Sequence, residues 1–342
     1  MKAHVCRVER LEGRALFASY SAATVSELIA AIDAANASKV ADEITLAAGA
    51  TFSLTAVNNS ATGATGLPVI AAGSGGLTIV GDGATIERSA ASGTPAFRLF
   101  DVAARASLTL RNLTLQGGLT PSQGGAIYNG GTLALDGVTV QNNAARGAPG
   151  YGTFWGGLDA PGGDALGGGV YSSGDLTITG GTFLNNQAIG GRGQDSRVVY
   201  SGDGNKTITS SSRGGNSYGG AVYIAGGTAS ITASMFIANT AAGGDSGAPL
   251  YPHPAAPGGN GFGGGLFAAG RSVALRAVTV TGNIARGGLG GGVNGAPGDG
   301  IGGGIYILDG RASLDDYTVS HVLNNTASTS SANIAGSYKR QR

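Results

Sequence analysis

A repeated unit constrains the fold of this chain more than any other feature of its sequence. Five segments start from paired glycines, pass through a short aliphatic and aromatic step, continue as alternating strands and close with asparagine. One unit of this kind cannot bury its apolar face alone, whereas units stacked along an axis generate a continuous core. The repeats therefore predict a solenoid, and its five units start at Gly124, Gly167, Gly219, Gly263 and Gly302.

The spacing inside each unit predicts short strands joined by tight bends. Leu133 and Leu135, for example, alternate with small or polar residues, and a period of two is typical of a strand with one buried face. Each unit offers about three such strands. Glycine, at 65 of 342 residues, supplies the positive φ angles of the corners. Uneven spacing of the aromatic markers indicates insertions between units; these markers are Tyr128, Tyr171, Tyr223, Phe267 and Tyr306.

We therefore predict an all-β fold, a right-handed single-stranded parallel β-helix of the pectin-lyase-like type with glycine-rich loop insertions. Alternating segments from Ile44 onward give about eight rungs. Thr24 and Glu27 form a T-x-x-E capping box, which predicts a short N-terminal helix that covers the first rung. Residues 1–23 are expected to form a disordered leader or export element, residues 24–326 the coil with its cap, and residues 327–342 a flexible polar tail.

The asparagine that closes each unit is expected at one corner of the coil. Asparagine tolerates the left-handed backbone region, and its side-chain amides can stack into a hydrogen-bonded ladder. We interpret this ladder as structural, and its expected members are Asn143, Asn186, Asn239, Asn283 and Asn325.

The charge and cysteine content argues against several classes of protein. With 21 basic and 20 acidic residues the net charge is +1, so no electrostatic attraction to nucleic acid is expected. Cys6 is the single cysteine, so it forms no intrachain disulfide, and with three scattered histidines it makes no zinc site. No stretch approaches the roughly 18 consecutive apolar residues of a spanning helix. We expect a monomer without a transmembrane segment.

Two short motifs resemble those of known families. The step "GGAIY" at the first unit, followed by Val140 to Asn143, resembles the repeats of chlamydial polymorphic outer-membrane proteins. The segment "RLEGRALFA", in which Phe17 replaces a leucine, is similar to the N-terminal element of planctomycete extracellular proteins. These resemblances imply an extracellular or cell-surface β-helix with an adhesive role. The C-terminal membrane domain of the chlamydial family has no counterpart in this sequence, so self-secretion is not expected.

Parallel β-helices also carry polysaccharide lyases and glycoside hydrolases, so the fold leaves catalysis open. Hydrolysis of a glycosidic bond needs two positioned carboxylates, and the adjacent Asp315 and Asp316 are followed by His321. The alternative interpretation of these residues is a solvated edge of the last rung. We expect no cofactor, although calcium is left open for three acidic residues of the glycine-rich stretches, Asp164, Asp245 and Asp299.

Long insertions at residues 144–166, 187–218 and 240–262 are expected to leave the coil on one side and to form its adaptable surface. Aromatic residues beside basic ones would suit sugar rings or acidic glycans. The alternative is that these side chains pack the loops onto the coil. The candidate ligand-binding residues are Tyr151, Phe154, Trp155, Arg192, Arg197 and Tyr200.

These observations predict a non-catalytic extracellular or cell-surface module that presents loops for adhesion or for contact with polysaccharide or extracellular matrix. The alternative is a polysaccharide lyase or glycoside hydrolase that acts on an acidic or cell-wall polysaccharide. A groove in which carboxylates and a basic residue converge would favour the enzyme. A groove lined with glycine, serine, threonine and asparagine would favour the module.

Overall fold

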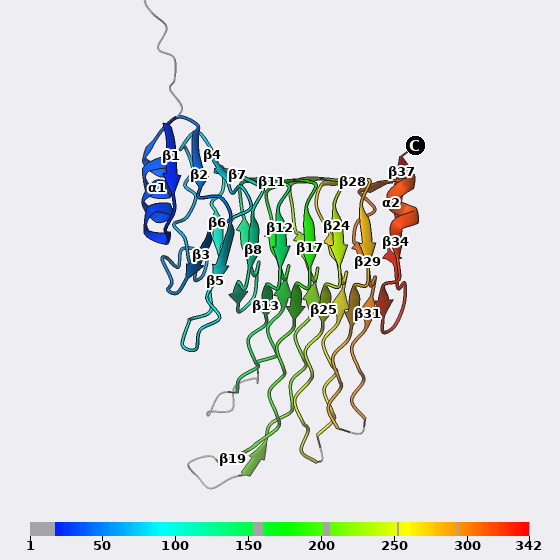
Figure 1. Cartoon of the computed structure of the whole chain (residues 1–342). Coiled ribbons are helices and arrows are strands. Elements are labelled where there is room, and N and C mark those ends of the chain that lie inside the picture. The colour runs from blue at the N-terminus through cyan, green and yellow to red at the C-terminus, as the bar shows by residue number, and fades with distance from the viewer. Residues whose placement is uncertain (1–17, 153–159, 201–205, 252, 293, 342) are drawn as a thin grey trace, which may run out of the picture.

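The computed structural model describes residues 18–152, 160–200, 206–251, 253–292 and 294–341 of the chain, and these residues form a parallel β-helix (Figure 1). The largest sheet has ten strands. Every strand in it pairs in parallel with the equivalent strand of the next coil, so that Leu133 lies between Leu108 and Leu176. Its strands, in spatial order, are β1 (Ala18–Ala22), β2 (Asp42–Leu46), β4 (Leu77–Val80), β7 (Ser107–Arg111), β11 (Thr132–Asp136), β16 (Asp175–Thr179), β23 (Thr228–Thr232), β28 (Ser272–Arg276), β33 (Ala312–Asp315) and β37 (Tyr338–Gln341).

Two further sheets enclose the core with the ten-stranded sheet. The eight-stranded sheet contains β3 (Thr51–Leu54), β5 (Thr85–Arg88), β8 (Thr114–Gln116), β12 (Thr139–Gln141), β17 (Thr182–Leu184), β24 (Met235–Ile237), β29 (Thr279–Thr281) and β34 (Val322–Leu323). The seven-stranded sheet contains β6 (Phe100–Val102), β10 (Ile127–Asn129), β15 (Val170–Ser172), β22 (Val222–Ile224), β27 (Leu266–Ala268), β32 (Ile305–Ile307) and β36 (Ile334–Ala335). Inside them, like residues stack on like residues, as the Phe183 and Phe236 rings do at 4.7 Å between centroids.

Two smaller parallel sheets extend each central coil beyond the three strands that the sequence predicts. The six-stranded sheet contains β9 (Leu119–Thr120), β13 (Ala144–Arg146), β18 (Gln187–Ile189), β25 (Thr240–Ala242), β30 (Ile284–Arg286) and β35 (Thr326–Ala327). The four-stranded sheet contains β14 (Ala165–Leu166), β21 (Ser217–Tyr218), β26 (Gly261–Phe262) and β31 (Gly300–Ile301). The prediction of three strands was therefore too low, because strands of two or three small residues are too short to show an alternating pattern.

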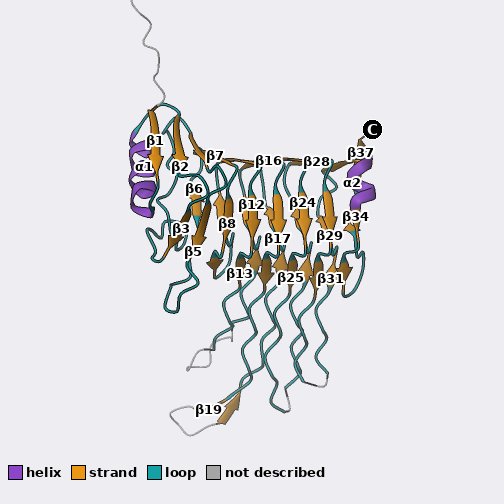
Figure 2. Cartoon of the chain, viewed as in Figure 1, coloured by secondary structure: helices purple, strands orange, loops and turns teal. Residues whose placement is uncertain are grey.

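Helices lie only at the two ends of the described coil (Figure 2). Helix α1 (Val25–Ala37) begins at Thr24, whose side chain accepts a hydrogen bond from the Glu27 backbone N–H, and the Glu27 carboxylate accepts from the Thr24 N–H. This is the predicted capping box. Leu28 and Ile32 are fully buried against the first rung. The coil starts earlier than the predicted residue 24, because β1 already pairs with β2.

The prediction of a flexible tail at residues 327–342 was wrong for the described part of that segment. Strand β36 pairs with β32, and β37 pairs with β33 from Tyr338 opposite Ala312. The edge of β33 offers a row of backbone N–H and C=O groups that pair regardless of side-chain type. A largely polar sequence suffices there, since Lys339 and Arg340 are exposed and only Tyr338 packs against the core.

The closing asparagines form a buried ladder through the coil. Each Nδ2 donates to the Oδ1 of the asparagine in the next rung at 2.9–3.1 Å, and each backbone N–H donates to that same oxygen at 2.9–3.3 Å. Every polar group of the amide is therefore paired inside the core, which is the condition for burying it at low cost. The buried ladder runs through the predicted Asn143, Asn186, Asn239, Asn283 and Asn325, and it ends at the exposed Asn333, eight residues after Asn325.

The left-handed backbone expected at these asparagines lies one residue earlier. Asn142, Asn185 and Asn324 have φ angles of 54°, 54° and 58°, and Ala238 takes the same conformation at 55°. The ladder asparagines themselves are absent from the positive-φ residues of the described chain. The corner and the ladder therefore use neighbouring residues, because one residue turns the chain and the next one points its amide inward.

The glycine-rich insertions are an ordered layer rather than adaptable loops over much of their length. They run side by side away from one edge of the coil (Figure 1). Backbone hydrogen bonds of 2.8 Å join glycine to glycine across neighbouring insertions, from Gly215 to Gly191 and from Gly244 to Gly215. A Cβ atom at Gly215 would lie 2.0 Å from the carbonyl oxygen of Gly163. The segments can pack this closely only because the residues at these contacts are glycines.

Candidate functional site

The predicted catalytic pair has structural partners. Asp315 caps helix α2 (Asp316–His321), because its Oδ1 accepts a hydrogen bond from the Thr318 N–H at 2.8 Å. Its Oδ2 accepts a second hydrogen bond, from the Ala277 N–H at 2.9 Å. Asp316 forms an ion pair with Arg340 at 2.7 Å. Both carboxylates therefore make structural contacts at the C-terminal end of the coil.

The electrostatics of this end do not suit a general acid. Burial raises the pKa of Asp315, but the hydrogen bonds from Thr318 and Ala277 outweigh it, so that the pKa lies below its ordinary value. An aspartate of that kind stays ionised near neutral pH. The His321 ring stacks on Tyr317 at 3.7 Å between centroids, and its Nδ1 lies 2.8 Å from the Tyr317 carbonyl oxygen. The three predicted residues thus hold the end of the coil together.

The predicted loop residues are spread over the glycine-rich layer. Tyr151 and Tyr200 are 69% and 70% exposed. Tyr200 lies in β19 (Val198–Tyr200), which pairs antiparallel with β20 (Lys206–Ile208). Arg192 forms an ion pair with Asp195, and the Arg197 N–H donates to Thr209 Oγ1 at 3.2 Å. Phe154 and Trp155 lie outside the described residues.

Two of the three acidic residues considered for calcium hold loop backbone through their carboxylates. Asp164 Oδ1 accepts a hydrogen bond from the Asn216 N–H at 2.7 Å, and Asp245 Oδ1 accepts from the Leu289 N–H at 2.7 Å. Asp299 accepts a hydrogen bond through its backbone carbonyl from the Gly261 N–H. Across the described ranges, no cluster of three or more histidine, cysteine or acidic side chains is arranged to hold a metal ion.

The aromatic markers form a continuous stack on the outer face of the seven-stranded sheet. Their rings lie on successive rungs with centroids 5.0–5.5 Å apart, a distance at which offset aromatic rings attract each other. This first rank consists of Tyr128, Tyr171, Tyr223, Phe267 and Tyr306. Parallel register produces it, because each marker occupies the same position in its own strand.

A second aromatic rank adjoins the first. Tyr218 and Phe262 lie on neighbouring strands of the four-stranded sheet, with their centroids 5.4 Å apart. Tyr218 meets Phe267 edge to face at 5.1 Å, and Phe262 meets Tyr306 at 5.1 Å. We call the two ranks together the aromatic strip: Tyr128, Tyr171, Tyr218, Tyr223, Phe262, Phe267 and Tyr306.

A shallow cavity of about 370 Å³ opens over the C-terminal half of the aromatic strip, lined by six side chains, Tyr218, Tyr223, Phe262, Phe267, Tyr306 and Leu308. Burial raises the pKa of the Tyr171, Tyr218 and Tyr223 hydroxyls, so these groups stay neutral and can donate as well as accept hydrogen bonds. The strip therefore combines apolar rings, stacked on one another along the coil, with tyrosine hydroxyl groups.

The N-terminal end of the strip is closed by two buried charged residues, Arg98 and Asp101, which are bridged by the Thr62 hydroxyl. Asp101 occupies the position of the marker in the rung before Tyr128, and both Asp101 and Arg98 are at most 3% exposed. The Arg98 guanidinium lies 5.1 Å from the centre of the Tyr128 ring and donates to Thr62 Oγ1 at 2.9 Å. Thr62 in turn donates to the Asp101 carboxylate. The strip is thus anchored to a fixed charge network.

Sequence reasoning used the first rank only as a marker of the repeat and missed the second rank. A usable signal existed, because Tyr218 and Phe262 each precede the paired glycines of their unit directly, at the position that Leu166 and Ile301 take in other units. Each of these units has one aromatic residue directly before its paired glycines and another a few residues after them. When the units stack in register, these two positions produce two adjacent rows of side chains.

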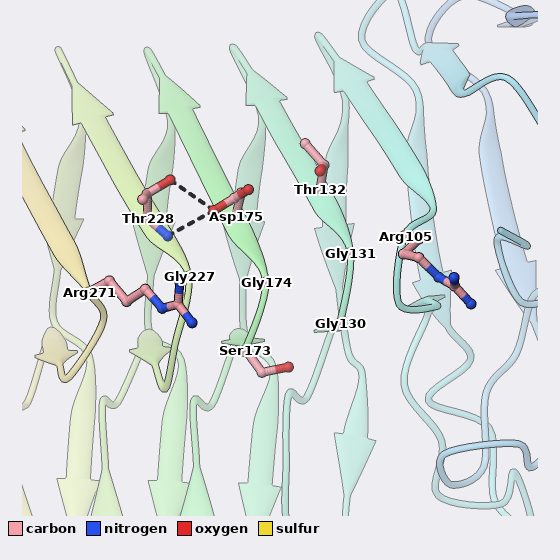
Figure 3. Close-up of a pocket in the computed structure, with 10 residues that line it drawn as sticks. All are labelled: Arg105, Gly130, Gly131, Thr132, Ser173, Gly174, Asp175, Gly227, Thr228 and Arg271. Atoms are coloured by element: carbon pink, nitrogen blue, oxygen red, sulfur yellow. Dashed lines mark hydrogen bonds between the residues drawn. The ribbon is translucent and has the colours of Figure 1, made fainter. Parts of the chain in front are cut away.

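A second cavity, of about 600 Å³, crosses the turns between the seven-stranded and ten-stranded sheets. We call it the corner groove (Figure 3). Asp175 lies near its middle and accepts hydrogen bonds of 2.8 Å from both the backbone N–H and the hydroxyl of Thr228. Arg105 and Arg271 stand at its two ends. Its other lining residues are small, namely Gly130, Gly131, Thr132, Ser173, Gly174 and Gly227.

No family model matches this chain, and neither a curated protein nor a solved structure matches it. Within the described ranges, neither helix has the length and apolar character needed to cross a membrane. The two surfaces, the aromatic strip and the corner groove, are therefore interpreted from their own geometry and chemistry.

Proposed function

We propose that this chain is a non-catalytic extracellular or cell-surface β-helix module that contacts glycans through the aromatic strip. The observation that carries the proposal is the continuity of the strip over five successive rungs, from Tyr128 to Tyr306. A sugar ring has an apolar face of C–H groups and a polar rim. Apolar ring atoms beside tyrosine hydroxyl groups match that pattern.

The length of the strip favours a chain of sugars over a single sugar. Five rungs at about 4.8 Å per strand spacing extend over roughly 19 Å from the first ring to the last. Several rings in one line can each contact a successive unit of a polymer, and linked contacts raise overall affinity without requiring any one contact to be strong. The loops that were first expected to bind would then flank the strip.

The alternative function, a lyase or hydrolase, would need two carboxylates positioned around one bond. Asp315 instead caps helix α2, and Asp316 forms an ion pair with Arg340. The corner groove contains the single carboxylate of Asp175 and two arginines among glycine, serine and threonine residues, so it lacks the second carboxylate that hydrolysis needs. The extracellular location is supported by the resemblance of the repeats to surface proteins.

A glycan array followed by calorimetry tests the proposal. The variant carries Tyr218→Ala and Phe262→Ala, which remove the second rank of the strip and leave the coil corners unchanged. We expect at least a tenfold loss of affinity for any glycan that the unchanged protein binds, equivalent to about 1.4 kcal/mol. Tyr251→Ala is the matched control, because Tyr251 is 93% exposed and lies outside the strip.

The proposal fails if the strip variant binds glycans as tightly as the control while its circular dichroism spectrum is unchanged. It also fails if the protein binds no glycan on a broad array. Incubation with acidic polysaccharides, read by ultraviolet absorbance and reducing ends, checks the enzymatic alternative, and product formation would replace the proposal by that alternative.

A further inference from the structure

The floor of the corner groove is fixed by the stacking of the coil. Gly131 and Gly174 lie on neighbouring rungs, and a Cβ atom at Gly174 would be 1.9 Å from the Gly131 carbonyl oxygen. At Gly227, on the next rung, a Cβ atom would be 2.3 Å from the Gly174 carbonyl oxygen. The stacking therefore excludes side chains at Gly174 and Gly227, where backbone alone forms the floor.

Two unpaired cations define the ends of the groove. Arg105 precedes β7 and Arg271 precedes β28, so four strand spacings of about 4.8 Å, or roughly 19 Å, separate their backbones along the coil. In the part of the chain that the structure describes, neither guanidinium makes a hydrogen bond or a contact ion pair. Each keeps five N–H donors free for a ligand.

The carboxylate between them does not neutralise the groove. Hydrogen bonds from the backbone and the hydroxyl of Thr228 lower the pKa of Asp175, with a smaller contribution from Arg271, so it is ionised at neutral pH. Its Oδ1 already accepts both of those hydrogen bonds. One negative and two positive charges leave the groove with a net positive charge at its ends.

From this arrangement we infer that the corner groove binds a linear acidic polysaccharide, with anionic groups of the chain paired to Arg105 and Arg271 and neutral hydroxyls facing the serine and threonine side chains between them. Guanidinium groups pair with carboxylate or sulfate through two parallel N–H···O bonds. A small anion could reach only one arginine, whereas a polymer of several sugars reaches both.

This inference goes beyond the proposed function, because it concerns a different surface and stands even if the aromatic strip binds nothing. Asp175 has a defined part in it. A fixed negative charge in mid-groove repels an anionic group placed there, so it selects chains whose neutral sugars or hydroxyls occupy the centre and whose charges fall near the two ends.

The test is calorimetry with oligosaccharides of galacturonic acid and of heparin, and with neutral dextran, at about 50 mM salt. The variants are Arg105→Gln, Arg271→Gln and both together. The matched control is Arg146→Gln with Arg286→Gln, which removes the same charge from exposed positions of the six-stranded sheet. We expect roughly five- to tenfold weaker binding for each single groove variant and less than twofold change for the control.

Further measurements decide between the outcomes. Affinity should rise from a single sugar acid to a chain long enough to span the groove, and it should fall as salt increases. A preference for galacturonate would assign carboxylate as the recognised group, and a preference for heparin would assign sulfate. The inference is overturned if the double groove variant binds as tightly as the control, or if neither acidic polymer binds. The strip variant, Tyr218→Ala with Phe262→Ala, should retain this binding, which separates the two proposals.

Discussion

The middle of the asparagine ladder offers a direct test of how the coil is held together. Replacing Asn239 by alanine removes four hydrogen bonds. The Asn239 Nδ2 donates to the Phe183 carbonyl at 3.0 Å and to Asn283 Oδ1 at 2.9 Å. Its Oδ1 accepts from the Nδ2 and the backbone N–H of Asn186 at 3.0 and 2.9 Å.

The cost follows from which groups lose their only partner. Asn283 Oδ1 still accepts from the Asn239 N–H, and Asn186 Nδ2 still donates to the Val140 carbonyl. The Asn186 N–H, in a residue with no exposed surface, keeps no partner. One orphaned buried group costs about 1–3 kcal/mol, and the other lost bonds about 0.5–1.5 kcal/mol each. With one orphaned group and three other lost bonds, we therefore expect Asn239→Ala to lower the free energy of unfolding by about 2.5–7.5 kcal/mol.

Urea unfolding followed by far-ultraviolet circular dichroism measures this change, and the slope of the transition reports whether the whole coil still unfolds together. Asn325→Ala is the comparison, because Asn325 is 8% exposed near the end of the ladder and water can replace part of its pairing. It should cost about half as much. A loss below about 1 kcal/mol at Asn239 would refute the view that the ladder stabilises the coil.

Four more changes have expected outcomes. Ala238→Asn should raise the free energy of unfolding by about 0.5–1 kcal/mol in urea titrations, because Ala238 is exposed and holds a φ of 55° that asparagine adopts more easily; a loss of stability would contradict this. Gly215→Ala should open the glycine layer to limited proteolysis, since its Cβ would overlap the Gly163 carbonyl, and unchanged cleavage would count against the packing described. Arg98→Met should cost about 3–5 kcal/mol by leaving Asp101 buried without its cation, measured by thermal unfolding; wild-type stability would disprove a role for the pair. Asp315→Ala should cost about 1 kcal/mol as a lost helix cap. Because its folded pKa lies below the unfolded one, the Asp315 contribution is present at neutral pH and is lost as pH falls through the folded pKa, so wild type and variant should converge in acid.

The sequence predicted the coil because the features that build it are local and repeat. Leu133 and Leu135 alternate within five residues, and Thr24 with Glu27 is a self-contained cap. The C-terminal strand was missed for the opposite reason. Tyr338–Gln341 has no apolar alternation, and it becomes a strand only because β33 presents an unpaired edge beside it. That information lies in the neighbouring coil rather than in the segment itself.

The candidate surfaces were harder to predict because they depend on register between coils. Arg105 and Arg271 lie far apart in sequence, and only the stacking of β7, β11, β16, β23 and β28 brings them to one groove. Sequence reasoning searched instead for acidic residues adjacent in the chain, which led to Asp315 and Asp316. The glycine layer was misjudged because glycine-rich sequence is usually flexible, whereas here the missing side chains allow backbone to bond directly to backbone.

The asparagine ladder also bears on how such a protein can change in size. Successive members are 43, 53, 44 and 42 residues apart, yet each meets its neighbour through the same pair of hydrogen bonds. Removing residues 187–239 would therefore set Asn186 against Asn283 with equivalent partners on both sides. One coil can therefore replace another in the stack. Duplication or deletion of a coil within the gene can lengthen or shorten the β-helix without a new core having to evolve.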